Sequence, residues 1–490
     1  MEKRQEKWAW ILRALHEQAT EIPISGKAIP AVYNERLNGY VPGQQQYDYP
    51  AHTLRVVSGS KNITVSPGAQ TGLFTSIGRG DPHSYRPNEF FFSNWVYDGL
   101  VEYGPDGEIL PALATSWSVE AVGEGEEYTF DLRQGVTFSD GATWNCAVAK
   151  LNFEHMMAPP LRTSDWHGWY GFPAALADTG AFSCESDYVF KIKTKVAYYP
   201  LLQDLTYIRP TRMLSPNAFN AGASSDVYTD NSCPTGWSPI PGVNGGSDIT
   251  CKGTKGIIGT GRWTYVKTVT ETVNGETKTK EVILKRNKNH WDTSTGDVEF
   301  ITLVVYDTAA AVNAALLDKS LDAVLGAGVL EPSATKAFKT TAGFTVKMTK
   351  PIMNRMVIFN TAKAPTNNLQ NRKAMIHAID KETIIDKELA GLANTVDALF
   401  PKDAPYCGID LTPKWSYDIE KAELLNCPVE SNGGVAAGVV VAIVVPVGLL
   451  LIGSVAFVIF MRSREIQGKP LYKPLVKEDK GKNGKMHMEL

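Results

Sequence analysis

An uncharged apolar run near the C-terminus constrains this chain more than any other feature. The 27 residues from Val435 to Met461 include no Asp, Glu, Lys or Arg. A bilayer core is crossed by about 20 apolar residues in helical form, because a helix satisfies its own backbone hydrogen bonds. Pro446 is tolerated in such a helix more readily than in water. The sequence therefore predicts one transmembrane helix over residues 435–461.

The residues after this run predict its orientation. Residues 462–490 carry eight Lys or Arg and four Asp or Glu, and positively charged segments stay on the cytoplasmic side. Subtracting them from the 49 basic and 52 acidic residues of the chain leaves 41 and 48. A mildly acidic region carries no electrostatic footprint for nucleic acid. We therefore expect a single-pass, membrane-embedded protein with an extracellular or luminal N-terminal region, a cytoplasmic basic tail and no nucleic-acid partner.

The first residues do not fit an outward-facing N-terminal region. Residues 1–7 are mostly charged, and the apolar run from Trp8 to Leu12 ends at Arg13. A secretory signal peptide needs a longer apolar stretch. The sequence therefore predicts that Met1 is not the start of the natural product.

The six cysteines fit an oxidising compartment, and no pair has the spacing of a zinc or redox motif. Cys233 and Cys251 flank a stretch rich in Gly, Pro and Ser, residues 234–250. We predict a disulfide between these two, since it would close a loop with high conformational entropy. The pairing of the others stays open: Cys146, Cys184, Cys407 and Cys427.

One tripeptide supports export. Asn62, Ile63 and Thr64 form an acceptor sequence for N-linked glycosylation. Because such tripeptides often arise by chance, the support is weak. Asn62 is our predicted glycosylation site.

The remainder of the chain predicts a mixture of helices and strands. Strand patterns alternate with helical ones in the sequence. The strand patterns are Tyr128–Leu132, Val189–Lys193, Val282–Arg286 and Phe300–Tyr306. The helical patterns are Trp144–Met157, Ala309–Leu317 and Leu369–Leu389. This alternation indicates an α/β fold, and the length favours two lobes.

Several sequence blocks occur in an order that resembles a known family. The blocks include Leu110–Ala114, Tyr128–Phe130, Phe138–Gly141, Ile258–Trp263 and Arg286–Trp291. Together they resemble the family 5 extracellular solute-binding proteins, which are the oligopeptide, dipeptide and nickel receptors of ATP-binding cassette importers. The resemblance runs from about Leu54 to Cys427, and agreement of many blocks is more specific than one motif.

The resemblance implies a two-lobed, periplasmic-binding-protein-like fold of type II that closes over a small solute. Two further blocks, Ala197–Gln203 and Asn360–Asn367, narrow it toward the nickel-binding branch. In that branch the metal arrives wrapped in a small carboxylate or histidine chelator. The sequence shows no nucleophile elbow, phosphate loop or catalytic carboxylate pair, so we expect a binding protein and not an enzyme.

The order of the blocks assigns four residues to a ligand site. Arg162 and Arg209 match arginines that hold the chelator's carboxylates, Tyr85 matches a cleft tyrosine, and Trp166 (or Trp169) matches a cleft tryptophan. A guanidinium suits this role because it donates in one plane to both oxygens of a carboxylate. For each residue a purely structural role remains the alternative.

The resemblance does not extend to a metal site. None of the eight histidines stands in a ligand-spaced pair on a predicted helix face. We therefore expect no cofactor, and nickel only as part of a bound chelate. For Arg133 we expect a structural ion pair within a strand.

The chain departs from the family in two places. Residues 1–55 resemble the family's C-terminal ending, and residues 435–461 stand where a long second-lobe stretch would follow Cys427. We expect a solute-binding domain at 56–430, with lobe one at about 56–265 and a truncated lobe two at about 266–430. A circular permutation or a fragment of a tandem array would explain this order, and the missing signal peptide favours the fragment.

These inferences predict a membrane-anchored extracellular protein that captures a peptide or a nickel chelate for transport. Its partners would be that solute and a membrane transporter. The alternative is a single-pass receptor or adhesion protein that keeps the fold but not the ligand.

Overall fold

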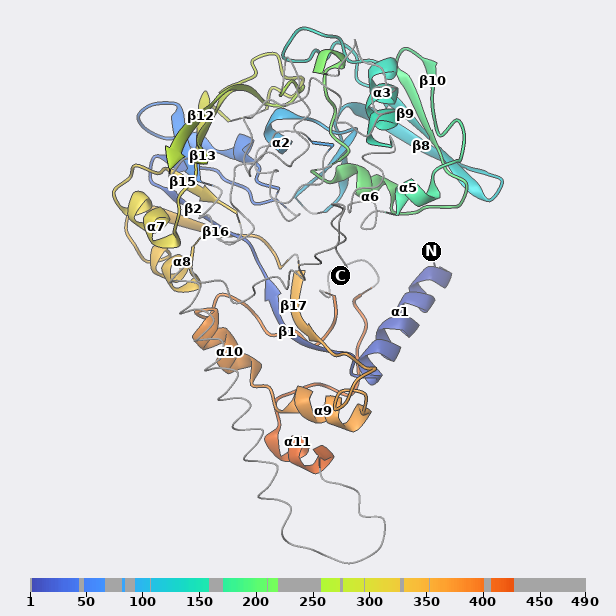
Figure 1. Ribbon diagram of the computed structural model, residues 1–490, viewed down its shortest axis with the longest axis vertical. Coiled ribbons are helices and arrows are strands. Elements are labelled where there is room, and N and C mark those ends of the chain that lie inside the picture. The colour runs from blue at the N-terminus through green and yellow to red at the C-terminus, as the bar shows by residue number, and fades with distance from the viewer. Residues whose placement is uncertain are drawn as a thin grey trace, which may run out of the picture. The chain divides into compact units, whose positions relative to one another are not determined.

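The computed structural model describes most of the chain before residue 427 (Figure 1). The described ranges are 2–43, 48–66, 82–83, 93–105, 107–157, 171–208, 210–218, 257–273, 276–294, 296–326, 330–351, 353–400 and 407–426. The chain divides into two units, residues 1–426 and 427–490. Within the described ranges, no helix combines the length and apolar character that a bilayer crossing requires. The predicted span at 435–461 and the basic tail lie outside the described residues.

A mixed sheet forms the centre of the first unit. Among the described residues it has seven strands, in the order β12 (Trp263–Val273), β13 (Glu276–Arg286), β14 (Phe300–Val304), β5 (Asn62–Ser66), β15 (Ala323–Leu325), β2 (Pro30–Asn34) and β16 (Phe344–Met348). Strand β5 is parallel to both its neighbours, whereas β2 is antiparallel to β15 and β16. The N-terminal strand β2 thus pairs on both sides with strands that come from much later in the chain.

The two faces of this sheet are buried by different elements. Val32 on β2 packs in a cluster with residues of α7 (Ala309–Leu317) and α8 (Pro332–Phe338). Its neighbours Ala31 and Tyr33 belong to the larger core on the opposite face, as the alternation of side chains along a strand requires. Figure 1 shows α7 and α8 beside β2, β15 and β16.

A four-stranded antiparallel sheet shares this larger core. Its order is β10 (Phe182–Ser186), β11 (Val189–Lys193), β9 (Gly125–Leu132) and β8 (Ala114–Val122), within the described residues. Helix α3 (Cys146–Met156) packs on it, with the ring of Phe153 tilted against the rings of Phe182 and Phe190. The Asn145 side chain caps α3 by accepting from the amide of Val148.

A disulfide joins Cys146 at the start of α3 to Cys184 on β10. This confirms that the chain contains a disulfide, and it resolves one pairing that the sequence left open. The predicted Cys233–Cys251 pair lies outside the described residues, as does Cys427. Cys407 is buried beside α1, where its sulfur accepts from the indole of Trp8.

Replacing both Cys146 and Cys184 by alanine should destabilise the protein by about 4 kcal/mol, because the bridge closes a loop between residues 38 apart in sequence. Chemical denaturation of the oxidised protein and of the double variant would measure the difference. Adding a reductant should lower the denaturation midpoint of the unmodified protein more than that of the variant, which lacks this bridge and keeps only the other cysteines. Equal midpoints for the two oxidised proteins would contradict this expectation.

Two crossing segments connect the large sheet to a second group of elements. One leads from β1 (Glu21–Lys27) into β2, and the other leads from β16 into β17 (Met353–Ile358). They are bonded to each other, since the amide of Ile29 donates to Thr349 Oγ1 and the amide of Thr349 donates to the carbonyl of Ile29. Two bonded segments therefore cross between the large sheet and the second group of elements.

The second group contains the N-terminal helix. Strands β1 and β17 pair antiparallel, beside α1 (Glu2–Glu17), α9 (Leu369–His377), α10 (Lys381–Glu388) and α11 (Ile419–Asn426). The buried Arg372 of α9 donates to the carbonyls of Gln18, Ala19 and Thr366. These bonds satisfy carbonyls at the end of α1, which have no partner within the helix.

Short elements complete the described fold: β3 (Leu37–Asn38), β4 (Arg55–Val56), β6 (Val101–Tyr103), β7 (Ile109–Pro111), α2 (Ser93–Val96), α5 (Phe172–Ala175), α6 (Leu201–Thr206), η1 (Ala51–Thr53) and η3 (Pro216–Ala218).

The expected division of the solute-binding domain near residue 265 does not match the sheet. Strands β12 to β16, over residues 263–348, belong to the same sheet as β5. The first lobe therefore extends to the crossing segment that follows Met348.

Candidate functional site

A cavity of about 180 Å³ lies where the N-terminal segment meets the larger core. Residues 41–43 and 48–50 form one wall, and α2, β6 and the end of α6 form the others. Its charged lining consists of Asp48, Asp98, Glu102, Arg212 and Arg262. The cavity thus gathers charges from segments that are far apart in sequence.

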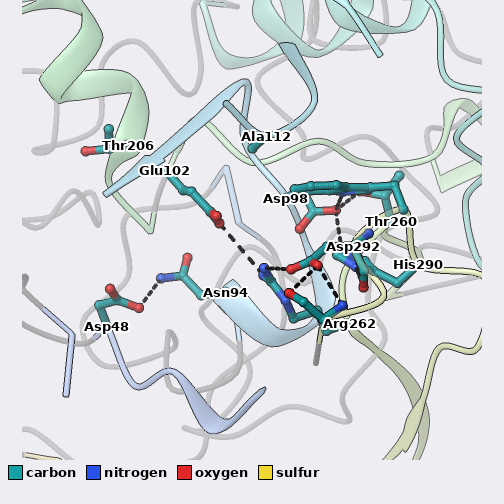
Figure 2. Close-up of polar contacts among 12 residues, drawn as sticks. Asp48, Asn94, Asp98, Glu102, Ala112, Thr206, Thr260, Arg262, His290 and Asp292 are labelled. Carbon is teal, nitrogen blue, oxygen red and sulfur yellow. Dashed lines mark hydrogen bonds and ion pairs between the residues drawn. The ribbon is translucent and has the colours of Figure 1, made fainter. Parts of the chain in front are cut away.

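The Asp48 side of the cavity is organised through Asn94 (Figure 2). Asn94 Nδ2 donates to Asp48 Oδ1 at 3.0 Å, and Asn94 Oδ1 accepts from Arg212 Nε at 2.9 Å. The indole of Trp95, the next residue of α2, donates to the carbonyl of Tyr49 at 2.5 Å. These bonds tie the N-terminal segment to α2.

Arg212 has an unused donor in this cavity. Its Nη2 donates to the carbonyl of Thr206, but its buried Nη1 has no partner among the described residues. Gly99 makes room for the guanidinium, because a Cβ at that position would lie 2.1 Å from Nη1. Burial lowers the pKa of Arg212 from its ordinary value, but a guanidinium remains charged in proteins. Arg212 is therefore a buried cation in the cavity lining, and an acceptor that reached its Nη1 would gain a charge-assisted hydrogen bond.

Arg262 lies on the other side and pairs with two carboxylates. Its Nη2 donates to Asp292 at 2.8 Å, and its Nη1 lies 3.8 Å from Glu102 Oε2 (Figure 2). Burial alone would lower the pKa of Arg262, but Glu102, Asp98 and Asp292 together raise it. Its Nε has no partner among the described residues.

Asp98, beside Arg262 in the cavity lining, accepts hydrogen bonds from several buried donors. Its Oδ2 accepts from Thr260 at 2.9 Å, from the indole of Trp291 at 3.0 Å and from His290 Nε2 at 3.3 Å. Burial would raise the pKa of Asp98, but His290, Arg262 and the donated hydrogen bonds hold it below its ordinary value. Asp98 is therefore ionised at neutral pH.

The pKa values of the other two carboxyls in the cavity lining, Asp48 and Glu102, are shifted in the opposite direction to that of Asp98. Burial raises the pKa of Asp48 and of Glu102 above their ordinary values, and the nearby arginines only partly offset this. His52 also lines the cavity, and burial lowers its pKa to about 3, so it is neutral at physiological pH. The cavity thus offers two carboxyls that would gain from a cationic partner.

The cavity lining contains arginines with unpaired donor atoms beside two carboxyls whose charge the arginines offset only in part. This combination suits a zwitterionic ligand, which carries both an anionic and a cationic group. An ammonium group could pair with Asp48 or Glu102 while a carboxylate accepts from Arg212. Within the described residues, no group of three or more His, Cys, Asp or Glu side chains could hold a metal ion.

All four predicted ligand residues lie outside the described ranges: Tyr85, Arg162, Trp166 and Arg209. The segment that carries Arg209 nevertheless reaches the cavity, since Thr206 and Arg212 line it.

Asn62, the predicted glycosylation site, is exposed at the start of β5. The ion pair expected for Arg133 stays a prediction: among the described residues its guanidinium lies 4.1 Å from the ring centre of Trp291, and its Nε donates to the carbonyl of Ala112.

The charged lining of the cavity was not predicted from the sequence, although two of the blocks that resemble the family contain residues in or beside it. The blocks Ile258–Trp263 and Arg286–Trp291 supply Thr260, Arg262, His290 and Trp291, which converge on Asp98 and its surroundings. Gly259 is needed for this approach, because a Cβ there would lie 2.0 Å from the carbonyl oxygen of Val96.

A buried histidine pair was also missed. His83 Nδ1 and His155 Nδ1 lie 2.8 Å apart, and His83 Nε2 contacts the carbonyl oxygen of Arg212 at 2.8 Å. Since a carbonyl only accepts, His83 Nε2 donates and its Nδ1 accepts from His155. The pair therefore positions the backbone of Arg212.

Comparison with known proteins assigns this architecture to a family. Residues 108–426 match the bacterial extracellular solute-binding proteins, family 5, middle region. This match covers more than half of the chain. The chain belongs to family 5.

Family 5 proteins are ligand-binding receptors, not enzymes, and they are extracellular or periplasmic. One family 5 relative, the nickel-binding periplasmic protein of Escherichia coli K12, is 31% identical over 352 residues, which are 71% of this chain and 58% of that protein. The glutathione-binding protein GsiB of Pectobacterium atrosepticum is 24% identical over 341 residues, covering 69% and 56%. The chain thus spans less than two thirds of either relative.

The fold has family 5 counterparts among solved structures. NikA from Brucella suis, solved in complex with Fe(III)-EDTA, superposes with a TM-score of 0.56 at 27% identity. The superposition covers 74% of this chain and 63% of that protein. The α/β, periplasmic-binding-protein-like fold expected from the sequence is therefore confirmed.

Proposed function

We propose that this protein is a membrane-anchored extracellular receptor that captures a small zwitterionic solute, a short peptide or an amino-acid chelate of nickel. The observation that carries the proposal is the cavity, whose lining brings Arg212 together with Asp48 and Glu102. The nickel-binding and glutathione-binding relatives support these two classes of solute. Nickel in this proposal is cargo carried by its chelator.

The site would act by binding alone. Two groups of elements joined by crossing segments could close over the solute, with contacts made only in the closed state providing affinity. We propose Arg209 and Arg162 as further carboxylate partners, with Tyr85 and Trp166 as walls, from the family's block order. Handover to a membrane transporter would follow, as in other importers of this class.

The anchoring part of the proposal rests on the sequence. The apolar run at 435–461 supports a single crossing with the tail at 462–490 in the cytoplasm. The exposed side chain of Asn62 supports glycosylation of an outward-facing domain. Mass shift on glycosidase treatment, compared with an Asn62→Gln variant, would test the modification and the topology together.

One observation favours a receptor or adhesion protein without a transported solute. Within the described residues, the β1–β17 sheet of the second group has only two strands. A reduced second lobe would leave one wall of the cleft incomplete. This candidate predicts that neither class of solute alters the stability of the protein.

Replacing Glu102 by glutamine should stabilise the ligand-free protein and weaken solute binding. Because burial raises the folded-state pKa of Glu102, its contribution favours folding below the unfolded-state pKa and is lost as pH rises. Glutamine removes this cost at pH 7, so the melting midpoint should rise. It also removes the anionic partner of the solute's ammonium group, so Kd should increase about tenfold.

Melting curves and titration calorimetry with nickel plus histidine and with a tripeptide would measure both effects. Glu124→Gln is a matched control, since Glu124 is exposed and distant in sequence from the cavity lining. A raised midpoint with unchanged affinity would remove Glu102 from the solute site. A wild-type midpoint unmoved by either solute would favour the receptor without a ligand.

A further inference from the structure

A second pocket lies beside the crossing segments, on the side of α7 and α8. Its volume is about 350 Å³, which is within the range of small-molecule sites. The pocket is bordered by the start of α8, the end of β1, the end of β16 and the loop after α10. It shares no lining residue with the cavity at Arg212. We call it the crossing pocket.

Two cations lie next to each other in the crossing pocket. Lys27 of β1 pairs with Met353 of β17, and Ser25 pairs with Arg355. Lys27 and Arg355 are therefore diagonal neighbours whose side chains leave the same face of the two strands. Both are half-buried and both line the pocket.

Among the described residues, no carboxylate compensates either cation. Within the described residues, no Asp or Glu lies within ion-pair distance of Lys27 or Arg355. The closest polar contacts of Arg355 are long, 3.4 Å from Nη1 to Ser25 Oγ and to the carbonyl of Gly26. Burial, and for Lys27 also the charge of Arg355, lowers the pKa of both groups. Glu331 is the acidic lining residue, and it is exposed.

The remaining lining supplies apolar surface and one unused hydroxyl. Leu330, Met348, Leu389 and Leu392 are among the apolar residues that line the pocket. Thr335 is 1% exposed, and its Oγ1 has no hydrogen-bond partner among the described residues. A buried polar atom without a partner is costly unless a ligand or water satisfies it.

We propose that the crossing pocket binds a small organic carboxylate with a branched apolar body, separately from the solute site. The carboxylate lies against Lys27 and Arg355 and offsets their mutual repulsion. The apolar body covers the leucines, and Thr335 donates to the ligand. Since β1, β17 and α8 all contribute, the occupant contacts elements on both sides of the crossing segments.

Titration calorimetry on the purified full chain would test this with 4-methylpentanoate as the probe and its neutral isostere 4-methylpentanamide as the comparison. The carboxylate should bind at least about tenfold more tightly than the amide. Lys27→Gln and Arg355→Gln should each weaken carboxylate binding at least about tenfold. Lys347→Gln, an exposed change on β16 outside the pocket lining, should leave it unchanged.

Stability measurements separate a binding role from a structural one. If Lys27 serves a ligand, Lys27→Gln should not lower the melting midpoint of the ligand-free protein, because it removes repulsion. Equal affinity for carboxylate and amide, absence of binding, or equal effects of Lys27→Gln and Lys347→Gln would overturn the proposal. Nickel-histidine titrations do not depend on this pocket, so failure of one proposal is distinguishable from failure of the other.

Discussion

Replacing Val32 by aspartate is expected to leave the chain unable to fold. Val32 lies at the centre of β2, is 1% exposed and packs against α7 and α8. An unpaired carboxylate there would cost several kcal/mol or more, against a total stability of about 5–15 kcal/mol for a typical domain. Soluble yield and far-UV circular dichroism would show the loss. The effect is large because β2 joins β15 to β16 within the sheet.

Val57→Asp is the matched control for this prediction. Val57 follows β4 in the same N-terminal part of the chain, but its side chain is 59% exposed. The control should melt within a few degrees of the unmodified protein, since surface substitutions usually change stability by less than about 0.5 kcal/mol. If Val32→Asp melted like Val57→Asp, the N-terminal segment would not belong to the sheet.

The position of β2 shows which structural features could be predicted from the order of the family-like sequence blocks and which could not. The sequence indicated that residues 1–55 resemble the end of a solute-binding domain, and such a segment can complete a sheet begun elsewhere. Its register could not be predicted, because the pairing of Val32 with Val324 and Val346 joins residues hundreds of positions apart. Local patterns carry no information about such contacts.

Secondary structure followed local patterns more closely. The helix expected at 309–317 is confirmed as α7, capped by Thr308, and the strand expected at 189–193 is confirmed as β11. The single helix expected over 369–389 is wrong, because it is divided into α9 and α10. Asp380 caps α10 by accepting from the amide of Thr383, and this capping competes with a continuous helix.

The site was harder to anticipate than the fold. The order of the family-like sequence blocks pointed to Arg162 and Arg209 as ligand residues, and these assignments stay predictions. The described cavity is lined instead by Arg212 and Arg262. Asp98 and Glu102, which line the same cavity, lie in a segment without any motif. The contact between Asp98 and His290 spans 192 residues, so only the fold makes it visible.

Replacing Asp98 by alanine should destabilise the protein by about 5 kcal/mol or more. Asp98 is 6% exposed and accepts hydrogen bonds from Thr260, His290 and Trp291. Each hydrogen bond to a charged acceptor contributes about 1.5–3 kcal/mol, and its loss leaves a buried donor unsatisfied. Denaturant unfolding would measure the change. Asp131→Ala, an exposed aspartate on β9, is the control and should cost far less.

The charge of Asp98 can be separated from its shape with Asp98→Asn. Because the folded-state pKa of Asp98 is held below its ordinary value, its ionised form stabilises the protein above the unfolded-state pKa of about 3.9, and this contribution is lost as pH falls further. The asparagine variant should therefore be less stable at pH 7, and the difference from the unmodified protein should shrink as pH falls below about 4. Unfolding free energies measured across this range would show the convergence. A difference that stayed constant with pH would mean that Asp98 acts through packing alone, and that its contacts with His290 and Arg262 do not stabilise its charge.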